Sequence, residues 1–164
     1  MNRYVTVMGS LDKYQKGRLS IVNDTPRSYC HSNVFDVASR SKPYEKVAVA
    51  KNLEYVIEAI RAEGSSPWYA ANHDEFVVVL DGEVTVSFVE LAPVALATNK
   101  DGTQRLTAEP TGRKIGRVHM RRGHQSLLPK GTAYRFSSTK PSVMMQQTIV
   151  GDLTVQKWAE ICTR

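Results

Sequence analysis

The sequence predicts an all-β domain of the sandwich or barrel type, with one short helix and an extended N-terminal arm. Short apolar runs that alternate with polar residues indicate strands, and the segment "DEFVVVLDGEVTVSFVEL" (74–91) holds two of them around Asp81 and Gly82. Turn signals such as "DG", "KDG" and "PKG" recur between these runs. Only one segment has apolar residues at helical spacing. Many short strands separated by turns favour a sandwich or barrel.

The first 45 residues form the predicted arm. They are rich in polar and turn residues, and they contain too few apolar positions for an independent core. The run Tyr4–Met8 is compatible with a short strand within the arm. We therefore expect residues 1–45 to cover a neighbouring surface, either of the main domain or of another subunit. Residues 46–164 are then expected to form a single domain.

That domain is predicted to begin with a strand at Lys46–Ala50, followed by the one helix. The helical segment repeats its apolar residues at a spacing of three to four: Leu53, Val56, Ile57 and Ile60. Asn52 suits the N-cap position and Gly64 suits the C-terminal stop. These signals predict a short amphipathic helix over residues 53–63.

The rest of the chain is predicted to form strands. Two of them flank Asp81 and Gly82, a hairpin-type turn signal. The segment 121–138, "RRGHQSLLPKGTAYRFSS", predicts another pair of strands around "PKG", and "SVMMQQTIVGD" (142–152) predicts a further strand. The tail "LTVQKWAEICTR" (153–164) is compatible with a strand or a short helix.

The charge of the chain raises nucleic acid as a possible ligand. There are 22 basic and 16 acidic residues, which give a net charge of +6. The basic residues are spread out, however, and the densest cluster, "HMRRGH" (119–124), has no recognition helix or aromatic RNA-binding motif beside it. We therefore expect no nucleic acid partner, and interpret the cluster as a solvated face or as a surface complementary to an acidic subunit or an anionic ligand.

Segments that direct a chain to a membrane or to secretion are not evident. The apolar runs are too short to cross a bilayer, and the N-terminus lacks a basic segment followed by a long apolar stretch. The two cysteines, Cys30 and Cys162, form no CxxC pair. A cytoplasmic protein that does not bind membranes is the expectation.

Two segments resemble the paired motifs of the cupin superfamily. The first motif ends in Glu, six residues and Gly, which corresponds here to Glu75 and Gly82. The second is Gly, about five residues, Pro-x-Gly, two residues and His. It corresponds to Gly123, "HQSLL", the "PKG" at 129–131, "TA", and then Tyr134. This resemblance covers residues 66–150, and it implies a cupin-type double-stranded β-helix, also called a jelly-roll barrel.

The same resemblance implies that the metal site is degenerate. A metal-binding cupin carries histidines six and four residues before its motif Glu, and those positions hold Tyr69 and Ala71. The histidine position of the second motif holds Tyr134, so Glu75 alone remains of the four ligands. A phenol with a pKa near 10 is a poor ligand for Fe(II) at neutral pH. No metal ligand and no catalytic residue is therefore expected in this chain.

The chain further resembles the small (alpha) subunit of the two-component hydroquinone 1,2-dioxygenases. That resemblance implies a hetero-oligomer, α2β2, in which a larger catalytic cupin subunit holds Fe(II) and opens the ring of hydroquinone with O2 to give 4-hydroxymuconic semialdehyde. This chain would then be a non-metal-binding support, inactive alone, with the small aromatic substrate at or near the interface. The pocket or interface candidates are Trp68, Tyr69, His73, Glu75, Tyr134 and Trp158.

Two alternatives remain open at this point. His73 and Glu75 are two residues apart and would share one face of a strand, so with His119 or His124 they could form a set of two histidines and one carboxylate. That set would make the chain a homomeric metal-dependent enzyme. The other alternative is a metal-free cupin that binds a small molecule among apolar and tyrosine side chains.

Overall fold

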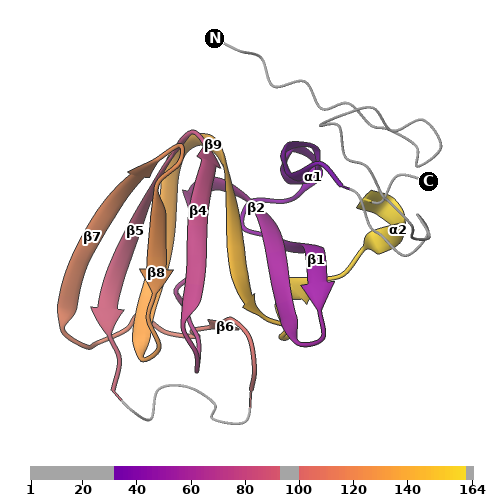
Figure 1. Cartoon of the computed structure of the whole chain (residues 1–164). Helices are drawn as coiled ribbons and strands as arrows, with labels where there is room; N and C mark the ends of the chain where they lie inside the picture. Colours follow the sequence, from indigo (N-terminus) through magenta and orange to yellow (C-terminus); the bar gives the residue numbers. More distant parts are fainter. Residues whose placement is uncertain (1–31, 93–99, 162–164) are drawn as a thin grey trace.

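A computed structural model describes residues 32–92 and 100–161, and strands dominate it (Figure 1). Ten strands and two short helices follow one another along this part of the chain: α1 Val34–Arg40, β1 Lys46–Asn52, β2 Tyr55–Ser65, β3 Tyr69–Ala70, β4 Glu75–Asp81, β5 Glu83–Glu90, β6 Gln104–Arg105, β7 Lys114–Arg121, β8 Gln125–Leu128, β9 Thr132–Ile149, β10 Thr154–Val155 and α2 Trp158–Ile161. The predicted all-β class is confirmed. Neither helix of this part is long or apolar enough to span a bilayer.

The long strand β9 belongs to both halves of one strongly curled sheet. Its residues 132–137 pair with β5, and Tyr134 also pairs with Tyr69 of β3. Its residues 142–149 pair with β2 and β4, and the pairing with β2 continues beyond the bend to Ser138 and Ser137. One half therefore has the order β6-β3-β9-β5-β7, and the other has the order β10-β1-β2-β9-β4-β8. The halves curl around a common interior, as Figure 1 shows.

The turns that the sequence marks connect strands of opposite halves. Asp81 and Gly82 join β4 to β5, but β4 pairs with β8 and β9 whereas β5 pairs with β7 and β9. The "PKG" turn likewise joins β8 to β9 without pairing them. The strands flanking both turns are confirmed, but the hairpin pairing expected at Asp81 and Gly82 is wrong. A turn signal specifies where the chain reverses, and packing of the two halves decides which strands become neighbours.

The predicted helix over residues 53–63 is wrong, because this segment forms most of β2. Leu53 lies in the preceding turn with φ of 55° and is 87% exposed. Both faces of β2 are buried: Val56 and Ile60 are on the interior side, and Ala59 packs on the outer side with β1 and the helices. A strand that is buried on both faces has a nearly continuous apolar pattern, which imitates helical spacing over a short window.

The two helices cover the outer face of β1 and β2. The residues that pack there are Val34, Val37, Val47, Val49, Ile57, Ala59, Trp158 and Ile161. Helix α1 begins where the Asn33 side chain accepts hydrogen bonds from the backbone N–H groups of Phe35 and Asp36, at 3.0 and 3.3 Å. The last part of the predicted arm thus packs on its own domain. Residues 1–31, including the proposed strand Tyr4–Met8, lie outside the described residues.

The glycine of the first motif is required by both backbone angle and space. Gly82 has φ of 79°, and a Cβ atom there would lie 2.2 Å from the Ser142 Oγ. That hydroxyl accepts a hydrogen bond of 3.1 Å from the backbone N–H of Glu83. Gly123 has a similar φ of 85°, but a Cβ atom there would meet nothing within 4 Å.

Gly82→Ala is therefore expected to cost more stability than Gly123→Ala. Both variants force an L side chain into the left-handed region, which costs about 1 kcal/mol. Gly82→Ala must also displace Ser142, which adds about 1–3 kcal/mol. Urea unfolding followed by circular dichroism measures both values. Equal losses in the two variants would show that the contact with Ser142 is unimportant.

Candidate functional site: a buried polar cluster around Glu75

The carboxylate of Glu75, at the start of β4, points into the interior and accepts hydrogen bonds from four side chains. Its Oε1 accepts from Thr103 Oγ1 at 2.5 Å, from Thr148 Oγ1 at 2.6 Å and from Gln146 Nε2 at 3.0 Å. Its Oε2 accepts from the Tyr134 hydroxyl. Glu75 is 1% exposed, so these donors replace the water that a carboxylate needs.

The orientation of the Gln146 amide follows from its neighbours. Its Oε1 accepts a hydrogen bond of 2.8 Å from the Lys46 ammonium, which can only donate. Its Nε2 therefore faces Glu75, and it also lies 3.2 Å from Thr103 Oγ1 and 3.1 Å from the Tyr134 hydroxyl. Gln146 links a buried cation to a buried anion through one side chain.

Lys46 brings the positive charge into this interior. Along β1, Val47 and Val49 face the helices, so Lys46 and Ala48 face inward. The ammonium lies 3.5 Å from Glu58 Oε2 and 5.1 Å from the centre of the Tyr69 ring. Glu58 Oε1 accepts from Thr154 Oγ1 at 2.7 Å. The charges of Lys46, Glu58 and Glu75 are thus arranged in one network that spans both halves of the sheet.

The tyrosines in this network stay protonated. Burial raises the pKa of the Tyr134 phenol well above its ordinary value, and the charge of the adjacent Glu75 raises it further. Burial raises the pKa of Tyr69 to about 12, although Arg105 acts in the opposite direction. The two rings contact each other with centroids 5.9 Å apart. A protonated Tyr134 donates to Glu75 and cannot act as a phenolate ligand.

The structure brings together four of the six candidates that the sequence predicted. Tyr69, Glu75 and Tyr134 meet in the interior, and His73 reaches the same cluster from the loop before β4, where its Nε2 lies 3.0 Å from Thr148 Oγ1. Trp68 lies apart, with the guanidinium of Arg135 stacked 4.6 Å from its ring centre.

The sixth candidate, Trp158, also lies outside the cluster. It begins α2 and packs against the outer apolar group on β1 and β2. Its indole Nε1 donates to Gln156 Oε1 at 3.3 Å. Trp158 therefore helps to attach the C-terminal helix to the sheet.

The alternative metal set is not assembled. His119 lies exposed on β7, where its Nδ1 is 2.8 Å from Thr85 Oγ1, and His124 Nδ1 accepts from the backbone N–H of Arg121. Within residues 32–92 and 100–161, no three His, Cys, Asp or Glu side chains lie close enough together to hold a metal ion. The donor set around Glu75 also does not fit iron, because both carboxylate oxygens already accept hydrogen bonds and the one nearby imidazole, His73, contacts Thr148 instead.

Sequence reasoning missed Lys46, Thr103, Gln146 and Thr148. Met144, Gln146 and Thr148 lie at every second position of β9, and all three are buried. Residues at this spacing share one face of a strand, so knowledge that Met144 faces inward would have predicted that Gln146 and Thr148 do too. Nothing in the run "KVAVA" marks Lys46 as inward, since a lysine at the start of a strand is usually solvated.

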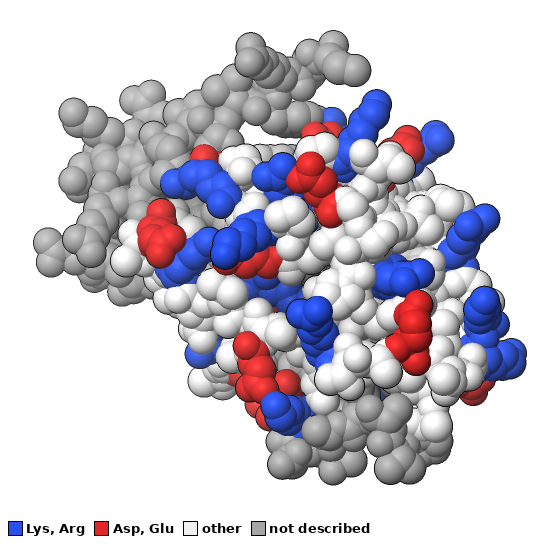
Figure 2. Space-filling model, turned by 180° about the vertical axis from the view of Figure 1, so that it is seen from behind, with Lys and Arg blue, Asp and Glu red and all other residues white. Residues whose placement is uncertain are grey.

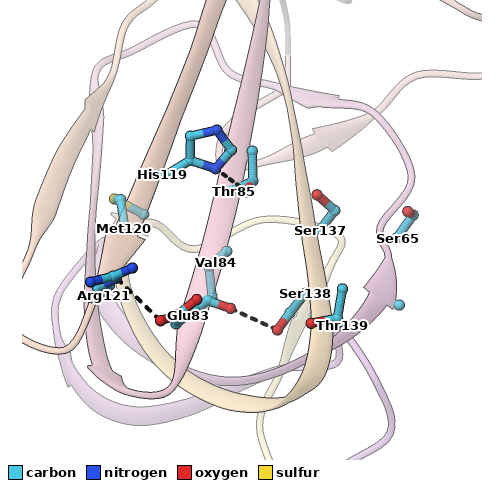
Figure 3. A pocket seen from close by; sticks show the side chains of 11 residues that line it. Ser65, Glu83, Val84, Thr85, His119, Met120, Arg121, Ser137, Ser138 and Thr139 are labelled. Atoms are coloured by element: carbon cyan, nitrogen blue, oxygen red, sulfur yellow. Dashed lines mark hydrogen bonds and ion pairs between the residues drawn. The ribbon is translucent and has the colours of Figure 1, made fainter.

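A separate hollow of about 650 Å³ lies on the outer surface of the sheet and shares no residue with the cluster. Figure 3 shows four of its lining residues in a row, Ser65, Ser137, Thr85 and His119, which come from four neighbouring strands. On the face that Figure 2 shows, lysines and arginines are interspersed with acidic residues. This dispersion does not resemble a continuous nucleic acid footprint.

Comparison with solved structures identifies two full-length matches. One is a chain of hydroquinone 1,2-dioxygenase PnpCD in complex with Cd2+ and 4-hydroxybenzonitrile, with 50% identity and a TM-score of 0.82 over 100% of this chain and 99% of that chain. The other is a chain of hydroquinone 1,2-dioxygenase from Sphingomonas sp. TTNP3 with 4-hydroxybenzoate bound. It has 48% identity and a TM-score of 0.84 over 98% of both chains.

More distant matches share the fold alone. A cupin-2 domain-containing protein from Shewanella frigidimarina has 16% identity and a TM-score of 0.53 over 72% of this chain and 93% of that chain. A longer chain of PnpCD, in complex with Fe3+, has 16% identity and a TM-score of 0.57 over 74% of this chain and 33% of that chain. These matches confirm the predicted cupin jelly roll. No family model and no curated protein matches the chain.

Lys46→Met is expected to lower the free energy of unfolding by about 3–5 kcal/mol, because it leaves the buried Glu58 carboxylate without its cation. Lys100→Met is the control, since Lys100 pairs with Asp152 on the exposed surface and such pairs contribute at most about 1 kcal/mol. Urea unfolding at pH 7 distinguishes the two. A loss no larger for Lys46→Met than for Lys100→Met would contradict this account of the cluster.

The stability of the chain is expected to fall as the pH rises from about 10 to about 12. Unfolded tyrosines lose their protons near pH 10, whereas Tyr69 keeps its proton until its pKa of about 12. Below pH 10 both states hold the proton, and the contribution of Tyr69 is fully present. Above it the slope for one tyrosine is about 1.4 kcal/mol per pH unit.

Tyr69→Phe should reduce this slope by about 1.4 kcal/mol per pH unit. Urea unfolding measured between about pH 9.5 and about pH 11.5, which lies around and between the two pKa values, gives the slopes. Tyr55→Phe, at a half-exposed phenol in the β1–β2 turn region, is the matched control. Identical slopes for wild type and Tyr69→Phe would show that Tyr69 ionises equally in the folded and unfolded chains.

Proposed function

The chain belongs to the hydroquinone 1,2-dioxygenase family, and from this membership we propose that it is the small, non-metal-binding subunit of a ring-cleaving dioxygenase. In this proposal a larger cupin subunit holds Fe(II) and converts hydroquinone and O2 to 4-hydroxymuconic semialdehyde. The present chain supports that subunit and is inactive alone. We assign the assembly to the cytoplasm, with an α2β2 composition.

The observation that carries the proposal is that both oxygens of the Glu75 carboxylate accept hydrogen bonds from protein side chains. In the arrangement that the cupin resemblance implies for a metal site, three histidines and this carboxylate would converge on one ion. Here Tyr134 and Tyr69 stand at two of the histidine positions, and Ala71 at the third provides no donor atom. Glu75 is held by four protein donors instead. Its lone pairs are used to stabilise the interior of this subunit.

The existence of a partner is supported by the longer chain found under the PnpCD name. That chain also has the cupin fold, although it is only 16% identical to this one. A two-component enzyme explains why a barrel without a usable metal site accompanies a dioxygenase. The iron would supply the redox chemistry in the larger chain, and the residues of this chain would hold its barrel in a fixed shape beside it.

Metal analysis of the purified complex tests the proposal. Co-expressed with the larger subunit, the chain should form a complex with about one iron per pair of chains, and the chain alone should hold almost none. Glu75→Gln and Tyr134→Phe, introduced into this chain only, should leave the iron content and hydroquinone consumption of the assembled complex unchanged. Native mass measurement confirms assembly of each variant.

Two results would contradict the proposal. If the Glu75→Gln complex assembles but loses its iron, Glu75 is a ligand and this chain is a metal subunit. If the chain alone binds iron in a one-to-one ratio and consumes hydroquinone, no larger subunit is needed and the proposal is wrong.

A further inference from the structure

Strand β7 is an edge strand whose two faces are both largely exposed. Among the described residues it pairs with β5 only, and its other edge carries no strand. Seven of its eight residues are exposed, and Met120 alone is buried. Figure 1 shows β7 at the outer end of its half of the sheet. Proteins normally protect such an edge, because its unpaired backbone groups can pair with another chain.

The register identifies the backbone groups that face this edge. The N–H of Leu91 donates to Gly131, on the β9 side, and the N–H of Glu90 donates to Arg113, on the β7 side. Backbone groups alternate in direction along a strand, so the even-numbered residues of β5 face β7. Their partners are Gly116, Val118 and Met120. The backbone groups of Arg117 and His119 consequently point to the open edge, whereas those of Arg121 are already bonded to His124.

The same edge is basic. Arg113, Lys114, Arg117, Arg121 and Arg122 lie within ten residues of one another. Arg113 lies 2.9 Å from Glu90 and Arg121 lies 3.1 Å from Glu83. Lys114 and Arg117 form no ion pair with a described residue. An acidic segment is the partner that this excess of positive charge would attract.

The outer surface beside the edge leaves room for such a segment. Ser65 pairs with Ser137, Ser137 with Thr85, and Thr85 with His119, so these residues form one row across β2, β9, β5 and β7. Three of these side chains are small, and the row lines the hollow of about 650 Å³ drawn in Figure 3, which leads to the edge at His119 and Arg121.

We propose that the β7 edge is a docking surface to which the larger subunit adds an acidic strand. This inference rests on the proposed function, which supplies the larger subunit. Backbone groups of Arg117 and His119 would continue the sheet into that strand, and the basic side chains would select acidic residues on it. A second copy of this chain fits less well, because two β7 strands side by side would bring like charges together.

The test measures the affinity of the full-length chain for the larger subunit. His119→Pro removes an edge-facing N–H, and proline is tolerated where a strand edge is open. His119→Ala is its matched control, because it removes the imidazole but keeps the N–H. His119→Pro should weaken binding about tenfold or more, and His119→Ala by no more than about threefold. Circular dichroism verifies that both variants are folded.

A second pair of variants examines the charge. Arg117→Glu should weaken binding about tenfold at low salt, with a smaller effect at high salt. Lys140→Glu, a reversal at the exposed bend of β9, should leave the affinity unchanged.

The outcomes separate the two proposals. If the wild-type chain binds the larger subunit and His119→Pro binds it as tightly as His119→Ala does, the edge is not the docking surface, but the proposed function stands. If the wild-type chain does not bind the larger subunit at all, both the proposed function and the proposed docking surface are wrong. If His119→Pro abolishes self-association of the chain, a second copy occupies the edge and the assignment to the larger subunit is overturned.

Discussion

A carboxylate inside an apolar barrel must be fully hydrogen-bonded, and much of this structure follows from that requirement at Glu75. An unpaired charge in such a place would cost several kcal/mol, on the order of the whole stability of a small domain. Four donors from β9 and from the segment before β6 therefore converge on it. The cluster ties together segments that are distant in sequence, and this constrains the register of β4 against β9.

Strand β9 can supply three of these donors because it passes through both halves of the sheet. Tyr134 comes from the part that pairs with β5, and Gln146 and Thr148 come from the part that pairs with β2 and β4. The bend near Ser138 and Ser142 separates these parts, and Gly82 packs closely against it. The first-motif glycine, the bend of β9 and the Glu75 cluster are thus parts of one arrangement.

Pattern and spacing predicted some parts of this arrangement and not others. Alternation in the segment around Asp81 predicted both strands, and the paired motifs predicted that Tyr69, Glu75 and Tyr134 would share one site. The helix predicted over 53–63 is wrong because helices cover the outer face of β2, which makes both faces of this strand apolar. The residues of a short segment do not show which other elements pack against it. Lys46 and Gln146 were missed because the sequence does not reveal which face of β1 or β9 turns inward.

The proposed role of the chain beside a larger subunit depends on whether protein donors or a metal ion contact the Glu75 carboxylate. Diffraction from crystals of the two-chain complex, with data on both sides of the iron absorption edge, answers this directly. The account predicts an anomalous peak in the larger subunit only, with Tyr134 and Gln146 still hydrogen-bonded to Glu75. An iron peak within about 2.2 Å of Glu75, at the distance of a metal–carboxylate bond, would contradict it.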